Sequence, residues 1–131
     1  MPNFESFSRK MLSLKADPHI TLHKRGTISL NRSAYLALDA PDAVELLYDR
    51  ERSIVGLRSV DARAENSYHV RSTSRSSGGP WVISAMAFTK FYDIDIHVSL
   101  RWPAHLDAGI LCADIAGEGI AVSGNRASTT E

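Results

Sequence analysis

The histidines and the single cysteine are the side chains of this 131-residue chain that first suggest chemistry. His19 and His23 lie four positions apart, but the alternating pattern around them predicts a strand, in which residues i and i+4 stand about 13 Å apart. The other three histidines are His69, His97 and His105. None of the five has a second ligand at the close spacing that metal sites use. Cys112 falls in an apolar run, where a thiol packs as a small hydrophobe. We therefore expect no metal site and no cofactor.

Patterns for nucleophilic or acid–base catalysis are equally sparse. No serine stands in a Gly-x-Ser-x-Gly turn, and the Ser/Gly-rich loop from Arg71 to Pro80 lacks the Gly-Lys-Ser/Thr of a phosphate-binding loop. Asp93 and Asp95 have the types of a carboxylate pair, although acidic turns after a helix are common. No catalytic residue is predicted, and an enzyme has no supporting motif.

Basic residues give the strongest functional pattern. Lys24 and Arg25 form a turn between two short strands, Arg32 follows the second strand, and Arg71 and Arg75 flank the Ser/Gly-rich loop, whose backbone could also cradle an anion. The whole chain has 15 Lys+Arg and 15 Asp+Glu, which excludes a strongly basic protein. Phosphate contacts need only a few cations on one face, so the sequence leaves two interpretations open: a nucleic-acid surface or a solvated basic turn.

The elements that must position these residues are short. Alternation predicts strands at 20–23, 27–30, 43–48, 53–58, 68–71, 81–83, 96–102 and 109–115, with the last two paired as a hairpin. Asn31 and Ser84 are predicted N-caps of helices at 33–38 and 85–92.

The order of these elements is the same in the two halves of the chain. A shift of 53 positions places Leu30-Asn31 on Ile83-Ser84, which suggests an internal repeat. We therefore predict a β-rich α+β fold in which two pseudo-repeated strand–helix–hairpin units form a small mixed β-barrel or sandwich with short helices. The expected organisation is one domain, residues 1–116, with units at about 20–60 and 68–116, followed by a mobile tail at 117–131.

Two further features point to an interaction surface. Phe4, Phe7 and Met11 have helical spacing and predict an amphipathic segment that docks on a partner or on a second copy. Trp102, next to Arg101 and Pro103, would serve recognition if it were exposed.

Residues 20–58 resemble the swapped-hairpin DNA-binding domain of AbrB, MazE and SpoVT regulators. The resemblance rests on the stretch from Lys24 through the strand Thr27–Leu30 to Leu38, and on the strands around Val44–Asp49 and Ile54–Leu57. It implies an intertwined homodimer in which Lys24, Arg25 and Arg32 contact phosphates. The chain departs from the family at Asn31, where proline is usual, and on the short helix, which lacks the usual arginine. The whole chain also resembles a group of uncharacterised small bacterial proteins, from which no activity follows.

Three functional hypotheses result. The first is a cytoplasmic, dimeric DNA-binding transcriptional regulator that uses Lys24, Arg25, Arg32, Arg71 and Arg75 on double-stranded DNA. The second is a non-enzymatic interaction or oligomerisation module. The third is a small-molecule-binding or enzymatic domain. No apolar run is long enough for a membrane-spanning helix, so no membrane partner is expected.

Overall fold

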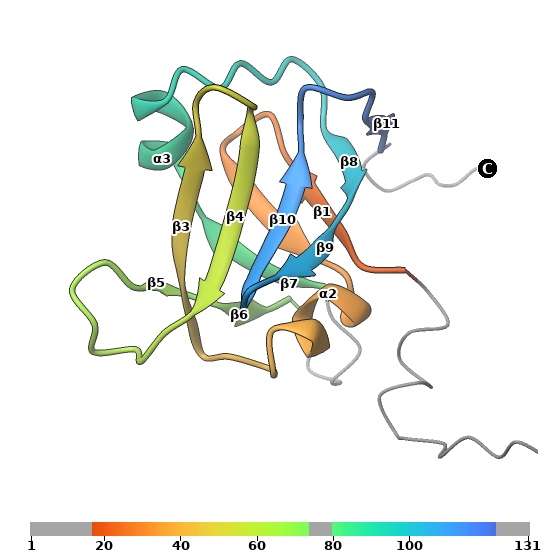
Figure 1. The fold of residues 1–131 in the computed structure, drawn as a ribbon. Helices are drawn as coiled ribbons and strands as arrows, with labels where there is room; N and C mark the ends of the chain where they lie inside the picture. Colours follow the sequence, from red (N-terminus) through yellow and green to blue (C-terminus); the bar gives the residue numbers. More distant parts are fainter. Residues whose placement is uncertain (1–16, 74–79, 123–131) are drawn as a thin grey trace, which may run out of the picture.

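Residues 17–73 and 80–122 are described by the computed structural model, and short strands dominate them (Figure 1). The strands are β1 (His19–Leu22), β2 (Thr27–Leu30), β3 (Ala43–Asp49), β4 (Ile54–Ser59), β5 (Tyr68–His69), β6 (Arg71–Ser72), β7 (Trp81–Ser84), β8 (Leu100–Pro103), β9 (His105–Asp107), β10 (Ile110–Asp114) and β11 (Ile120–Ala121). The helices are α2 (Arg32–Ala37) and α3 (Met86–Phe91), each of six residues. The predicted β-rich α+β class is confirmed.

The strands form two sheets. Sheet A has the order β11-β8-β1-β2-β7-β6, and sheet B has the order β5-β3-β4-β10-β9. All the strand pairs within the described ranges are antiparallel, so the mixed pairing expected from the sequence does not occur there. The chain passes between the sheets twice through a single residue, at Val70 between β5 and β6 and at Ala104 between β8 and β9. These two corners join the sheets at both sides.

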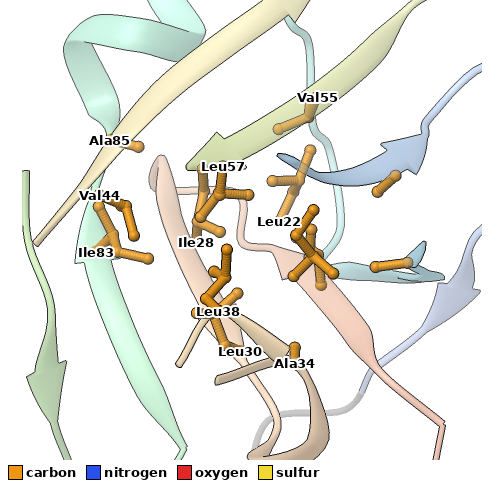
Figure 2. Close-up of a cluster of buried hydrophobic side chains, with 14 of the residues drawn as sticks. Leu22, Ile28, Leu30, Ala34, Leu38, Val44, Val55, Leu57, Ile83 and Ala85 are labelled. Atoms are coloured by element: carbon orange, nitrogen blue, oxygen red, sulfur yellow. The ribbon is translucent and has the colours of Figure 1, made fainter. Parts of the chain in front are cut away.

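The core lies between the inner faces of the two sheets. Figure 2 shows side chains from β1, β2 and β7 of sheet A meeting those from β3 and β4 of sheet B, with Ala34 and Leu38 closing one end. The largest fully buried apolar side chains are Ile20, Leu22, Ile28, Leu30, Val44, Val55, Leu57, Ile83 and Leu111. Most of them alternate with outward-facing residues, because successive side chains of a strand point to opposite faces. The outer faces are thereby left for polar side chains and for function.

Asn31 caps α2 as predicted. Its Oδ1 accepts from the backbone N–H of Ala34 at 2.9 Å and from that of His19 at 3.0 Å, while its Nδ2 donates to the carbonyl of Asp17. One side chain therefore starts the helix and also fixes the beginning of β1.

The predicted cap of the second helix is wrong. Ser84 is the last residue of β7, where it pairs with Thr27, and the N-cap of α3 is Ala85, which makes no side-chain capping bond. The backbone N–H of Ala85 donates instead to the carbonyl of Gly26 at 2.9 Å. This bond continues the β2–β7 ladder and ties the start of α3 to the β1–β2 turn.

The predicted second hairpin is also wrong. Strand β8 pairs with β1, and β10 pairs with β9, which lies inside the expected loop. The β9–β10 turn needs only two residues, Ala108 (φ 53°) and Gly109 (φ 82°), because two positive φ values give a tight turn that matches the strand twist. The hairpin is therefore formed by β9 and β10, and the strand before it, β8, joins sheet A.

The expected mobile tail begins with structure. Strand β11 pairs with β8, and the indole Nε1 of Trp102 donates to the carbonyl of Gly117 at 2.9 Å. The boundary predicted at 116 is therefore too early, and residues up to 122 belong with sheet A. Positions 123–131 lie outside the described residues, as does the amphipathic segment that contains Phe4, Phe7 and Met11.

Two pairs of equivalent elements begin 54 positions apart, which is one more than the shift read from the sequence. The spacing holds for the starts of β2 and β7 and for the starts of α2 and α3. It also holds for Asp39 (φ 69°) and Asp93 (φ 57°). Each of these two residues directly follows the C-cap residue of its helix and has a left-handed conformation. The shift of 53 came from treating Ser84 as the counterpart of Asn31.

Candidate nucleic-acid interface

The basic turn predicted to contact DNA is exposed at one end of the molecule. Lys24 and Arg25 project from the tight β1–β2 turn, in which Gly26 has a φ of +88°. A Cβ on Gly26 would lie 2.7 Å from the Cα of Met86, so the turn is held against the first residue of α3. The position of the two cations is therefore fixed by backbone packing.

Arg32 does not join this turn. It is exposed at the start of α2, and β2 separates it from Lys24 and Arg25, so the three residues lie at opposite ends of sheet A (Figure 1). The grouping of Arg32 with the basic turn, expected from the resemblance, is not what the fold produces. Arg75 lies outside the described residues.

Arg71 lies on the outer face of sheet A. It is exposed on β6 and pairs in register with Val82, whose neighbours Trp81 and Ile83 are both buried. Paired residues of adjacent strands share a face, so Arg71 and Val82 both point outward.

A second arginine, which the sequence analysis left out of the basic set, lies on the same face. Arg101 is exposed on β8 and pairs with Thr21, while its neighbour Trp102 points into the core opposite Ile20. The alternation of Leu100, Arg101 and Trp102 predicts an outward arginine. What the sequence does not reveal is that β8 lies beside β1.

The two arginines lie in one transverse row of the sheet, which Ile120 of β11 extends beyond Arg101. The register partners run Arg101–Thr21–Ser29–Val82–Arg71 across β8, β1, β2, β7 and β6. Four strand spacings separate the two guanidinium-bearing strands, which is about 19 Å along the sheet. The hydroxyl of Thr21 lies between them, whereas Ser29 is buried and its hydroxyl is hydrogen-bonded to His23.

Acidic residues are distributed unequally between the sheets. The strands of sheet A contain no Asp or Glu within the described chain, whereas those of sheet B contain Glu45, Asp49, Asp107 and Asp114. The carboxylates nearest to sheet A along the chain include Asp17 and Glu118, which precede β1 and β11. The net charge of the whole chain is zero, but the described strands of one of its two sheets carry no carboxylate.

His23 joins the basic turn to this face. Its Nε2 is hydrogen-bonded to the hydroxyl of Ser29 at 2.9 Å, and its Nδ1 to the hydroxyl of Ser99 at 3.2 Å. Partial burial lowers the pKa of the His23 imidazole, because desolvation disfavours the charged form. The ring is thus a neutral bridge between β1, β2 and the segment before β8.

A cleft of about 460 Å³ opens beside the basic turn. Its lining carries charges of both signs, with Lys24, Arg25 and Lys90 facing Asp93 and Asp95. The paired carboxylates considered as acid–base residues therefore lie among cations, and the Asp95 carboxylate is 3.1 Å from His97. This mixed lining favours neither an anion nor a cation.

Trp102 is not a surface residue. Only 5% of it is exposed, its ring packs in the core, and its N–H is used by Gly117. The prediction that it takes part in recognition fails, because the chain after residue 116 folds back over β8. A Cβ on Gly119 would lie 2.8 Å from the Trp102 ring, which shows how closely this segment covers it.

Other chemistries find no support in the described ranges. No group of three or more His, Cys, Asp or Glu there could hold a metal ion. Burial, followed by the charge of Asp107, raises the pKa of the Cys112 thiol, which opposes formation of the nucleophilic thiolate. None of the helices between residues 17 and 122 is long and apolar enough to cross a membrane.

Comparisons of the chain with protein-family models, with curated proteins and with solved structures gave no match.

Proposed function

We propose that this protein binds double-stranded DNA through the outer face of sheet A, as a transcriptional regulator does. Arg71 on β6 and Arg101 on β8 would contact phosphates, and Lys24 and Arg25, in the turn that joins the two central strands of the sheet, would add a contact beyond the row. The observation that carries the proposal is the absence of strand carboxylates from sheet A, together with two outward arginines in one row.

Charge on one face matters more here than charge on the chain. Phosphate contacts supply most of the sequence-independent affinity for DNA, and each one releases condensed counterions. Hydroxyl groups such as that of Thr21 also donate to phosphate oxygens, which positions a protein on the duplex. A row with an arginine on β6, another on β8 and the Thr21 hydroxyl between them supplies both kinds of contact.

The fold-level part of the proposal concerns the two units. Swapped-hairpin regulators are intertwined dimers, and we propose that the units of this single chain take the places of two such chains in a barrel-like arrangement. Support comes from the common 54-position spacing and from the pairing of β2 with β7 and of β4 with β10. The homodimer predicted from the resemblance would then join two such chains, which light scattering on the purified protein tests directly.

Duplex binding at several salt concentrations tests the main proposal. Wild-type affinity should fall steeply with salt, and the double variant Arg71→Ala/Arg101→Ala should reduce the slope of log K against log salt by about 1.8, since each lost phosphate contact removes about 0.9. The matched control is Arg63→Ala, an exposed arginine that pairs with Asp61 outside both sheets. Equal slopes for the double variant and the wild type would overturn the assignment of this face.

A further inference from the structure

Four aromatic rings gather where α3 meets the end of β3. Tyr48 lies 6.2 Å from Phe88 and 5.0 Å from Tyr92, measured between ring centroids. Phe91 stands edge-on to Tyr92 at 4.9 Å. Phe88 is buried and anchors the cluster, whereas 71% of Phe91 is exposed. The cluster is therefore tied to the core at one side and open to solvent at the other.

A cation accompanies the exposed rings. The guanidinium carbon of Arg50, in the β3–β4 turn, lies 4.9 Å from the ring centroid of Tyr92 and 5.8 Å from that of Phe91. Exposed aromatic rings beside an arginine are the combination by which proteins hold single-stranded nucleic acid, since the rings stack on bases and the cation attracts the backbone.

A cleft of about 350 Å³ adjoins the cluster. Figure 1 shows α3 and the loop that leads into β5 on the same side of β3, and the cleft lies between them. Its walls include Leu46, Asn66 and the rings of Tyr68, Phe88, Phe91 and Tyr92. Aromatic rings thus form much of the wall, and the Asn66 amide supplies both a donor and an acceptor.

The backbone of β3 adds a second hydrogen-bonding edge. Strand β5 covers one side of β3 only as far as the pair Val44–Tyr68. The carbonyl of Ala43 accepts from Val60 on the β4 side, so the alternation of an antiparallel ladder turns the N–H and C=O of Leu46 toward the opposite side. Leu46 lines the cleft. A donor and an acceptor on one residue match the edge of a nucleobase.

The charges at the cleft permit a nucleotide. Glu45 is the acidic residue of the lining, and its carboxylate forms an ion pair with Arg58 across the β3–β4 ladder. That pairing reduces its repulsion of a phosphate. Arg50 stands at the aromatic side with its charge available over the rings.

We propose that this cleft binds an unpaired nucleobase of a DNA strand, stacked on Phe91, with Asn66 and the Leu46 backbone reading the base edge and Arg50 contacting the adjoining phosphate. The inference rests on the proposed function, and it adds a site for single-stranded or locally opened DNA that is separate from the duplex-binding face. The transverse row of sheet A and the aromatic cleft are made by different strands, so the two sites can be disabled separately.

Binding of two fluorescently labelled probes tests this site. One probe is a short oligodeoxyadenylate, and the other is a strand of the same length made of abasic sites, which offers the phosphates without the bases. The wild type should bind the oligodeoxyadenylate about tenfold more tightly, since stacking of one base contributes about 1–3 kcal/mol. Phe91→Ala should remove that preference, and Phe91→Trp should keep it.

The control is Leu106→Ala, which removes another exposed apolar side chain, 51% exposed, from β9 in sheet B. It should bind both probes as the wild type does. Equal affinity of the wild type for the two probes would overturn the cleft, as would an equal loss on both probes in Phe91→Ala.

Two further measurements separate this site from the duplex face and from a site for free nucleotides. Arg71→Ala/Arg101→Ala should weaken duplex binding and keep the preference for oligodeoxyadenylate over the abasic strand. The proposed function and the cleft are therefore tested by different results. Adenosine monophosphate should bind much more weakly than the strand. If the protein bound adenosine monophosphate and the strand with equal affinity, the ligand of the cleft would be a free nucleotide, and the proposal would be overturned.

Discussion

Leu57 of β4 and Leu111 of β10 stand directly opposite each other in sheet B, and they lie 54 positions apart in the chain. This is the spacing that separates β2 from β7 and α2 from α3. A residue that pairs with its own counterpart marks the place where a twofold axis would cross the sheet. In sheet A the corresponding point falls in the middle of the β2–β7 ladder, between the pairs Ile28–Ile83 and Ser29–Val82.

Leu57→Ala and Leu111→Ala are therefore expected to have similar effects. Both side chains are fully buried in the same core, and truncating a buried leucine costs about 2–5 kcal/mol of unfolding free energy through lost transfer energy and the cavity left behind. Urea denaturation of the two variants measures this, with Leu106→Ala as the exposed control. A difference between the two buried variants as large as the effect itself would contradict the equivalence of the two units.

The turn that presents Lys24 and Arg25 depends on a glycine for two reasons. Gly26 has a φ of +88°, and a Cβ there would lie 2.7 Å from the Cα of Met86, a backbone atom that cannot move without shifting α3. Gly109 has a similar φ of +82° but nothing within 4 Å of the same position. Substituting the two glycines therefore distinguishes the free-energy cost of the positive φ, which both share, from the cost of the contact with Met86, which only Gly26 has.

We expect Gly26→Ala to destabilise the protein by clearly more than Gly109→Ala. Gly109→Ala should lower the unfolding free energy by only about 1–2 kcal/mol, the cost of a left-handed conformation for a residue with a Cβ. Gly26→Ala has this cost and also pushes the basic turn away from α3. Thermal unfolding of both variants provides the comparison. If Gly26→Ala also weakens duplex binding at a temperature where it is folded, the turn contributes to that surface. An equal loss of stability in the two variants would show that the contact with Met86 costs nothing.

Local features of the sequence predicted the elements well. Asn31 acts as an N-cap because its side chain needs only a backbone N–H three residues further on, and the strands around Ile20 and Ile28 alternate because each has one buried face. Ser84 has the residue type of an N-cap but lies one position too early, and its pairing with Thr27 in the sheet outweighs capping there.

Neighbour relations between strands were the part that could not be predicted. Nothing local indicates that β8 leaves its expected hairpin to pair with β1, and this pairing brings Arg101 into one row with Arg71. The burial of Trp102 depends on the segment around Gly117, which looked too polar to fold. The aromatic cleft likewise needs three segments, α3, β3 and the loop before β5, that are far apart in the sequence. The residue types were visible in the sequence, and their grouping depends on sheet order.

His23 should make the stability of the fold depend on pH. Burial lowers the pKa of its imidazole in the folded protein below the ordinary value of 6.5, so the unfolded chain binds a proton more readily than the folded one. Stability from this group is therefore complete above pH 6.5 and falls as the pH decreases from 6.5 toward the lowered pKa. The hydroxyls of Ser29 and Ser99 hydrogen-bond to the ring.

Replacing His23 by glutamine keeps a polar side chain and removes the titration. The unfolding free energy of His23→Gln, measured in urea at several pH values, should be lower than that of the wild type above pH 6.5 and should fall less steeply below it. The exposed His69, on β5, provides the control, because His69→Gln leaves the buried imidazole in place and should retain the wild-type pH slope. The unfolding free energy of His23→Gln could instead change with pH as steeply as that of the wild type. That result would mean that the His23 ring binds its proton in the folded protein as easily as in the unfolded chain, which contradicts the effect of its partial burial.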